Sequence, residues 1–225
     1  MRSQFIIFLF LITLNQLFAT DVFSVTKERI IKLGAAVSFA AFSPDGKKVI
    51  TSSTRYSSIR DLISDEEKTI YNGDDDHPVR FTAFSSDGNK VIIVSNSSSR
   101  YSDSDVRITD LTSGKERVIE VSCKVISASF SPDGNKIITV RDDSTVRITD
   151  LISGEEKIIK HGGQVNSAAF SPDGKKVITA SDDATAKITD LISGEVRIIK
   201  HNNEINFAVF SPDGKKVITA SDDYT

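Results

Sequence analysis

The sequence has no tryptophan and only one cysteine and one methionine in 225 residues. Because Cys123 has no second cysteine to pair with, no disulfide can form within the chain. A lone cysteine in a strand-like run, here residues 121–126, is usually a small packed side chain, so it indicates no nucleophile. Zinc-ligand spacings, phosphate-binding loops and dinucleotide fingerprints are also missing. We therefore predict no catalytic site, no cofactor and no metal.

An excess of either charge is missing too. The chain has 28 Lys and Arg against 31 Asp and Glu, a net charge of −3, and the basic residues form no stripe. A nucleic-acid-binding protein needs a basic footprint to neutralise phosphates, so this class is excluded. The acidic runs at Asp74–Asp76 and Ser102–Asp105 lack the glycine and the further oxygen ligands of a calcium loop. They predict solvated loops.

No apolar run in the sequence is long enough to span a bilayer, and the longest one lies at the N-terminus. Phe5–Leu14 is a run of ten residues behind Arg2, too short to span a bilayer and typical of a secretory signal. Residues 1–20 are therefore predicted to be an export signal of a secreted or periplasmic protein, with no other membrane association. A short uncleaved N-terminal anchor is the alternative, because Leu17 stands where cleavage after Ala19 would prefer a small residue.

What the chain has instead is an internal repeat. Residues 170–183 read FSPDGKKVITASDD, and residues 210–223 repeat them without a change. Earlier versions begin at Phe42, Phe84 and Phe130, so the spacings along the chain are 42, 46, 40 and 40 residues. A period of this length indicates a repeat architecture.

One repeat predicts four short antiparallel strands. A period-two run over residues 165–170 ends at the turn Ser171–Gly174, where proline and glycine suit the second and fourth positions. Residues 175–181, 185–191 and 195–200 supply three more strands, rich in β-branched residues and separated by tight turns. A sheet this small cannot bury both faces alone, so it must stack on its neighbours. The chain is predicted to be all-β.

The repeated residues, AFSPDGKKVITASDDxTxxITDLxSGE, resemble the WD-repeat β-propellers. The resemblance covers roughly residues 28–225 and departs in one consistent way, because the tryptophan of the Trp-Asp pair is absent. Thr109, Thr149 and Thr189 stand before an aspartate, and Arg60 stands before Asp61. The resemblance implies a propeller of four-stranded blades.

The predicted blades are four complete units and a partial one. They cover about residues 35–71, 79–121, 124–160 and 164–200, with the partial unit at 204–225, and residues 28–32 resemble an outer strand without its own blade. This number indicates an incomplete or small ring. Three resolutions are open: a small distorted ring, an oligomer of copies that completes the ring, or a truncated piece of a longer chain.

The resemblance also implies a structural hydrogen-bond network of histidine, serine and aspartate, with a threonine in place of tryptophan. A Ser–His–Asp catalytic triad is the alternative, but no oxyanion hole or nucleophile elbow accompanies these serines. In an earlier repeat, Arg141 replaces the serine and Cys123-Lys124 stands in place of the histidine. The predicted network residues are His161, Ser181, Asp183, Thr189, His201, Ser221 and Asp223.

The function implied by the resemblance is a non-catalytic scaffold for protein–protein interaction. Its partners would dock on loops at one face, through the polar and partly acidic residues Lys124, Asp142, Gln164, Asn166, Asp182, Glu204, Asn206 and Asp222. These residues favour a protein partner with basic or neutral polar groups, although loop chemistry does not identify it. Two alternatives stay open: a truncated remnant of a longer WD-repeat protein without independent activity, and an exported propeller hydrolase.

Overall fold

The computed structural model describes residues 37–73, 78–97 and 103–224. The predicted export signal and the acidic run Asp74–Asp76 lie outside these residues. No helix in the described part of the chain is long and apolar enough to cross a membrane.

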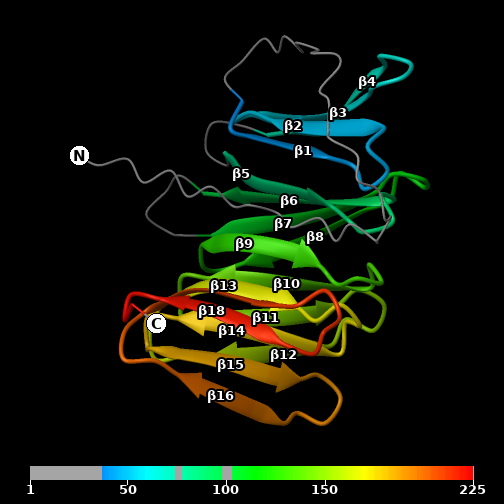
Figure 1. Cartoon of the computed structure of the whole chain (residues 1–225). Coiled ribbons are helices and arrows are strands. Elements are labelled where there is room, and N and C mark those ends of the chain that lie inside the picture. The colour runs from blue at the N-terminus through cyan, green and yellow to red at the C-terminus, as the bar shows by residue number, and fades with distance from the viewer. Residues whose placement is uncertain (1–36, 74–77, 98–102, 225) are drawn as a thin grey trace. The chain divides into compact units, whose positions relative to one another are not determined.

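All regular elements in the described ranges are β-strands, and they form five antiparallel sheets (Figure 1). Sheet 1 holds β1 (Phe39–Phe42), β2 (Lys48–Ser52), β3 (Tyr56–Asp61) and β4 (Glu67–Asn72). Sheet 2 holds β5 (Val79–Phe84), β6 (Lys90–Asn96), β7 (Ser104–Asp110) and β8 (Glu116–Val121). Sheet 3 holds β9 (Val125–Phe130), β10 (Lys136–Arg141), β11 (Thr145–Asp150) and β12 (Glu156–Lys160).

Sheets 4 and 5 continue the series. Sheet 4 holds β13 (Val165–Phe170), β14 (Lys176–Ser181), β15 (Thr185–Asp190) and β16 (Val196–Lys200), and sheet 5 holds β17 (Ile205–Phe210) and β18 (Val217–Ser221). Within every sheet the strands pair in chain order. The prediction of an all-β propeller fold with four complete blades and a partial one is confirmed.

The turn after the first strand of each sheet has the geometry that its sequence predicts. In sheet 4 the hydroxyl of Ser171 donates to Asp173 Oδ1 at 2.6 Å, and the amide of Gly174 donates to the carbonyl of Ser171 at 2.8 Å. Gly174 has a φ of 68°, a left-handed conformation that costs glycine little. The same φ sign and the same serine–aspartate bond recur in the other sheets, so this turn fixes the hairpin register each time.

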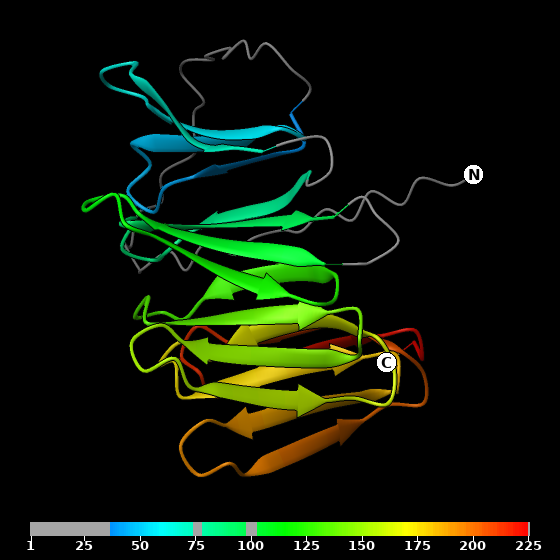
Figure 2. The ribbon, with the colours of Figure 1, turned by 180° about the vertical axis from the view of Figure 1, so that it is seen from behind.

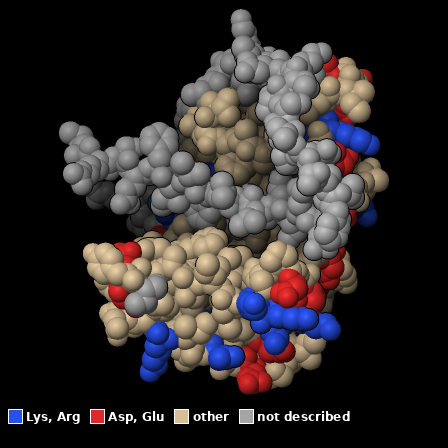
Figure 3. Space-filling model, viewed as in Figure 1, with Lys and Arg blue, Asp and Glu red and all other residues tan. Residues whose placement is uncertain are grey.

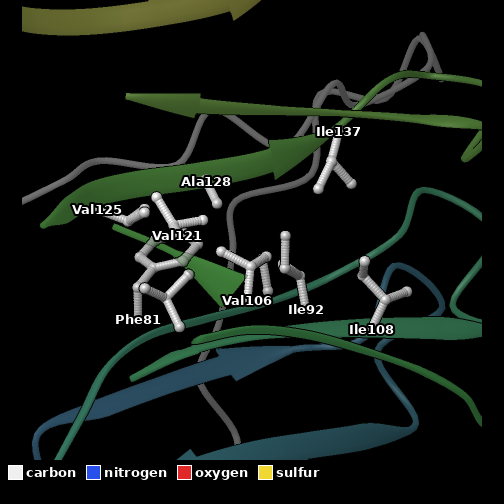
Figure 4. Close-up of a cluster of buried hydrophobic side chains, with 10 residues drawn as sticks. Phe81, Ile92, Val106, Ile108, Val121, Val125, Ala128 and Ile137 are labelled. Atoms are coloured by element: carbon white, nitrogen blue, oxygen red, sulfur yellow. The ribbon is translucent and has the colours of Figure 1, made fainter. Parts of the chain in front are cut away.

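The apolar core lies between consecutive sheets. Neighbouring residues of a second strand point to opposite faces, so Ile137 joins the cluster shared with sheet 2, whereas Ile138 joins the one shared with sheet 4. In Figure 4, Ile92 and Val106 of sheet 2 point toward Ile137 and the other side chains of sheet 3. Figures 1 and 2 show the sheets following one another in chain order, and the four clusters of described residues each join a sheet to the next.

The first strand of each sheet contacts the preceding sheet through a fixed pattern. A branched residue, a small residue three positions later and a phenylalanine two positions after that face backward. In sheet 5 these are Ile205, Ala208 and Phe210, which cluster with Ile178 and Ala180 of sheet 4. Stacking therefore repeats one interface along the chain.

Candidate functional site: the loop face

The strand ends of each sheet form two opposite edges, and the turns alternate between these two edges along the chain. The turns between the first and second strands and between the third and fourth lie at one edge. The turns between the second and third strands, with the loops that lead into the next sheet, lie at the other. We call this second edge the loop face. In sheets 3 to 5 it comprises residues 121–126 with 141–144, 161–166 with 181–184, and 201–206 with 221–224.

A β-bulge shapes the loop face at the start of four first strands. In sheet 4 the pairing of β13 with β14 jumps from Val165 to Ser167, so Asn166 is the extra residue. Asn206 in sheet 5, Ile126 in sheet 3 and Arg80 in sheet 2 are extra in the same way. A bulge turns the side chain of its extra residue away from the regular alternation. The side chains of Asn166, Asn206 and Arg80 lie at the rim, whereas Ile126 packs against the apolar cluster between sheets 3 and 4.

Three of the predicted binding residues meet at the bulge of sheet 4. The amide of Asp182 donates to the carbonyl of Gln164 at 2.9 Å, and Nδ2 of Asn166 donates to Asp182 Oδ1 at 2.5 Å. The same Nδ2 also donates to the carbonyl of Ile205 at 3.1 Å, which ties the rim to sheet 5. Gln164 is exposed, and Asn166 and Asp182 are half-buried.

Sheets 5 and 3 repeat this arrangement with different chemistry. In sheet 5, Asp222 donates its amide to the carbonyl of Glu204 at 3.0 Å, and Asn206 Nδ2 donates to Asp222 Oδ1 at 2.5 Å. In sheet 3 the amide of Lys124 donates to Asp142 Oδ1 at 3.0 Å, and Asp142 returns its own amide to the carbonyl of Lys124 at 3.0 Å. The eight predicted binding residues thus form three equivalent groups, one in each sheet.

The groups share an aspartate and differ at the position before the first strand. That position is Lys124, Gln164 and Glu204 in order, so its charge changes from positive through neutral to negative while the aspartate stays. All three side chains are exposed, and their backbone is fixed by the paired hydrogen bonds. A rigid rim with variable exposed side chains can bind by charge and hydrogen bonding, and its acidic end lies at sheets 4 and 5.

Sequence reasoning missed Arg80. Its side chain is exposed and its residue is the extra one of the sheet 2 bulge, in the position of Asn166 and Asn206. The signal was present, because Arg80 follows a valine that precedes a phenylalanine by five residues, as Asn166 does. Together with Lys124 it adds a second exposed cation to the rim of sheets 2 and 3, where the carboxylates of Asp142 and Asp143 are exposed as well.

The predicted histidine–aspartate network lies directly beneath this rim. In sheet 4, Nδ1 of His161 lies 3.1 Å from Asp183 Oδ2, and Nε2 lies 2.7 Å from the hydroxyl of Thr179. The amide of Gly162 donates to the same carboxylate oxygen at 2.8 Å. In sheet 5, His201 lies 2.9 Å from Asp223 and 3.0 Å from Thr219 in the same way. The network fixes the loop before the first strand to the turn after the second.

Three predicted members do not belong to the network. Ser181 donates its hydroxyl to the carbonyl of Gly163 at 3.1 Å, and Ser221 donates to that of Asn203 at 3.2 Å; these serines hold the loop backbone, not the imidazole. The ring is hydrogen-bonded instead by a threonine two residues earlier on the same face of the strand, Thr179 in sheet 4 and Thr219 in sheet 5. The imidazole extends further along the strand than the loop backbone does. The hydroxyl of Thr189 is buried without a hydrogen-bond partner among the described residues, so it does not close the network.

The electrostatics of His161 and Asp183 suit a structural role. Burial lowers the pKa of His161 and Lys187 lowers it further, against the opposing effect of Asp183. Burial opposes ionisation of Asp183, but hydrogen bonds from Thr185, Gly162 and His161 lower its pKa to about 2. The neutral ring therefore donates from Nδ1 to the carboxylate and accepts the Thr179 hydroxyl at Nε2. The hydroxyl that Nε2 of the ring contacts belongs to Thr179, which is 0% exposed and so lies out of reach of a substrate.

Sheet 3 lacks the network, and the residue in the place of the histidine is not the predicted one. Val121, the last residue of β8, takes the position of His161 and is buried in the apolar cluster between sheets 2 and 3. The prediction of Cys123-Lys124 was wrong, because Val121 precedes His161 by 40 residues, the spacing of these two repeats, and the strand pairing gives the same alignment. Cys123 stands at the position of Gly163, and burial raises the pKa of its thiol. Arg141, at the position of Ser181, is 5% exposed, and its Nε has no partner among the described residues.

Three stretches of the chain match the family model described as WD domain, G-beta repeat: residues 116–150, 155–190 and 194–225. Each match begins near the outer strand of one sheet and continues into the next, as residues 116–150 cover β8 and then β9 to β11. These three stretches are WD repeats. A comparison with curated proteins gives no match. Domains made of WD repeats are typical scaffolds for protein–protein interaction, and the predicted resemblance is confirmed.

The described residues of the WD repeats offer no metal centre, because no group of three His, Cys, Asp or Glu side chains converges among them. On the side of the molecule shown in Figure 3, basic and acidic side chains lie next to one another instead of forming a band of one sign. The loop face is the candidate site that combines exposure with a fixed backbone.

Proposed function

We propose that the chain is an exported scaffold that binds a protein partner on its loop face. The observation that carries this proposal is the set of three equivalent groups at sheets 3, 4 and 5, each with a bulge and a backbone fixed by hydrogen bonds between loop and turn. A preorganised rim loses little conformational freedom on binding, which favours recognition. The variable position makes each sheet contribute different chemistry.

The charge of the rim narrows the partner. Asp182, Glu204 and Asp222 make the end at sheets 4 and 5 acidic, whereas the end at sheets 2 and 3 is mixed, with Arg80 and Lys124 beside Asp142 and Asp143. We expect a polypeptide segment that places basic or polar groups at the acidic end. The difference between an acidic end and a mixed end would favour one direction of the segment along the rim.

A site-specific crosslinking experiment in the native source tests this function. A photoreactive amino acid is placed at Glu204 or at Lys124 on the loop face, with Ile192 as the control in an exposed turn at the opposite edge. We expect one discrete heterologous adduct from the loop-face positions and none from position 192. Adding Asp182→Lys and Asp222→Lys should remove the Glu204 adduct. Equal adducts from both edges would contradict the proposal.

Export is supported by the sequence of the N-terminal segment alone. Residues 5–14 are apolar and follow a basic residue. Fusing residues 1–25 to a reporter enzyme should move the reporter out of the cytoplasm, and the variant Leu9→Arg should retain it. A reporter that stays in the cytoplasm with the unchanged segment would contradict export.

A further inference from the structure

Two exposed apolar faces in the described chain have the composition of the interface that joins consecutive sheets. The first is the forward face of sheet 5, formed by Ile218 and Ala220 of β18. The second is the backward face of sheet 1, formed by Val37, Ala40 and Phe42. Both lack a covering sheet among the described residues, and their exposure is large enough to need a physical account.

The forward face is best judged against its own duplicate. Residues 170–183 and 210–223 are identical, yet Ile178 is 0% exposed and Ile218 is 66% exposed. Ala180 is likewise buried, whereas Ala220 is exposed. Ile178 and Ala180 are covered by Ile205, Ala208 and Phe210 from the first strand of sheet 5. Since the sequence is the same, the neighbour alone makes the difference.

The backward face is judged in the same way. Val37, Ala40 and Phe42 occupy the positions that Ile205, Ala208 and Phe210 occupy in sheet 5. In sheet 5 these residues are at most 8% exposed, whereas Phe42 is 60% and Val37 is 47% exposed, and Ala40 is exposed as well. Sheet 1 thus presents the half of the interface that covers an isoleucine and a small residue.

The two faces also complement each other at their turns. In three interfaces a proline ring approaches the turn glycine of the next sheet: a Cβ built on Gly88, Gly174 or Gly214 would meet Cδ of Pro44, Pro132 or Pro172 at 3.5 Å. A Cβ on Gly46 of sheet 1 meets no described atom within 4 Å. Pro212 of sheet 5 is exposed and has no such glycine against it among the described residues. Pro212 and Gly46 are the matching halves of one more contact.

We propose that a second copy of the chain docks its Val37–Ala40–Phe42 face onto the Ile218–Ala220 face of the first copy. The docked sheets would then repeat the part of the interface between sheets 4 and 5 that β14 makes, with Phe42 and Ala40 in the places of Phe210 and Ala208. Such an interface is heterologous, because the two copies contribute different surfaces. It closes into a ring of copies or continues as a chain of copies, according to the rotation that each step makes.

The driving force is burial of apolar surface. Exposed contiguous apolar patches of this kind mark interaction sites in soluble proteins, and large aliphatic and aromatic side chains gain most from leaving water. The occupant is a second copy because it carries the residue types, in the same order and with the same turn geometry, that cover this face inside the chain. This inference is independent of the loop face, which lies at the edges of the sheets.

The test uses the full 225-residue chain and two variants, Phe42→Asp and Ile218→Asp, each of which charges one face. Light scattering during size-exclusion chromatography should give the unchanged chain a mass of at least twice 24.6 kDa. Each variant alone should run at the mass of one chain. The matched control Ile192→Asp charges an equally exposed isoleucine, 78% exposed, in a turn outside both faces, and should keep the mass of the unchanged chain.

Mixing the two variants decides between this arrangement and others. Phe42→Asp retains an intact Ile218 face, and Ile218→Asp retains an intact Phe42 face, so the mixture should form a species of two chains. Circular dichroism of each variant should show the strand content of the unchanged chain, because both substituted side chains are exposed. The proposal is overturned if the unchanged chain is a monomer at all concentrations, if the control dissociates equally, or if folded variants fail to combine.

Discussion

Sheets 3 and 4 have the same strands, turns and loop-to-turn hydrogen bonds, but they hold their loops with opposite chemistry. In sheet 4 the imidazole of His161 joins Asp183 to Thr179 beneath the rim. In sheet 3 the same position is Val121, which is 3% exposed within an apolar cluster. The amide of Asp142 nevertheless bonds the carbonyl of Lys124 as that of Asp182 bonds Gln164. The geometry of the rim therefore does not need the polar network.

The network adds local stability, but only if each of its polar groups keeps its hydrogen-bond partner. A buried polar chain is favourable only while every member is hydrogen-bonded, whereas an apolar side chain in the same place has no such condition. Sheet 3 gives up the polar chain but keeps a buried guanidinium, Arg141, whose Nε is unpartnered among the described residues. Substitutions that change a single polar group should therefore alter the free energy of unfolding differently in the two sheets.

The largest effect should come from Asp183→Asn. Each oxygen of Asp183 accepts two hydrogen bonds: Oδ1 from the amide and hydroxyl of Thr185, and Oδ2 from His161 and the amide of Gly162. An asparagine NH₂ group would face donors on either side, so we expect a loss of about 1–3 kcal/mol in the free energy of unfolding, measured with urea.

Asp143→Asn is the matched control in sheet 3. Asp143 uses only Oδ1, for the amide and hydroxyl of Thr145, and its second oxygen receives no hydrogen bond from a described residue. The asparagine can keep both bonds and turn its NH₂ group to solvent, so the loss should be under about 0.5 kcal/mol. Equal losses in the two sheets would contradict the difference drawn between them.

The next effect should have the opposite sign. Arg141→Met replaces a guanidinium that is 5% exposed with an apolar chain of similar length, and the free energy of unfolding should rise by about 1 kcal/mol. Arg147→Met is the comparison on the next strand, where NH1 lies 2.6 Å from Glu156 in a partly exposed ion pair. That variant should lose about 0.2–1 kcal/mol. A lower free energy of unfolding for Arg141→Met would show that the contacts of the guanidinium outweigh the cost of burying it.

Two threonines of sheet 4 sharpen the comparison within one sheet. Thr179 bonds Nε2 of His161, so Thr179→Val should lower the free energy of unfolding by about 1 kcal/mol. The Thr189 hydroxyl is buried without a described partner, so Thr189→Val should leave that energy unchanged or raise it by less than about 1 kcal/mol. Thermal unfolding of both variants checks the pair, and a reversed order would mean that Thr189 belongs to the network after all.

The smallest effect is a pH dependence carried by His161. Burial lowers the pKa of His161 from 6.5 in the folded chain. Between this lowered pKa and 6.5, the unfolded chain therefore binds more protons than the folded one. The stability that the neutral ring contributes is complete above pH 6.5 and decreases as the pH falls below it. An NMR titration of the imidazole should give a midpoint below 6.5, and one at or above that value would contradict the neutral ring.

The turns and strands could be predicted because their causes are local. Ser171, Pro172 and Gly174 specify one hairpin turn by their own backbone preferences, and the same letters recur along the chain. The pairing of His161 with Asp183 was also predictable, through the resemblance to the WD repeats. These parts depend on residues that the repeat places at fixed spacing.

The parts of the site that the sequence did not predict depend on strand register and on how far side chains extend along a strand. The exchange of Ser181 for Thr179 follows from how far the imidazole reaches along a strand face, which no spacing states. Val121 was missed because a valine has no polar group to mark the position, although the 40-residue spacing of these repeats already aligns it with His161. The bulges at Asn166 and Asn206 leave the sequence alternation looking regular, and Arg80 was overlooked for the same reason.

The apolar clusters that join each sheet only to the next have a consequence for folding. Nearly all contacts then lie within one hairpin series or between adjacent repeats, so sequence separations are short and the cost of closing loops stays small. Stability becomes a sum of terms for each repeat and for each junction between neighbours. Folding can start at any repeat and spread along the chain, and damage to one junction should divide the molecule into two cooperative units.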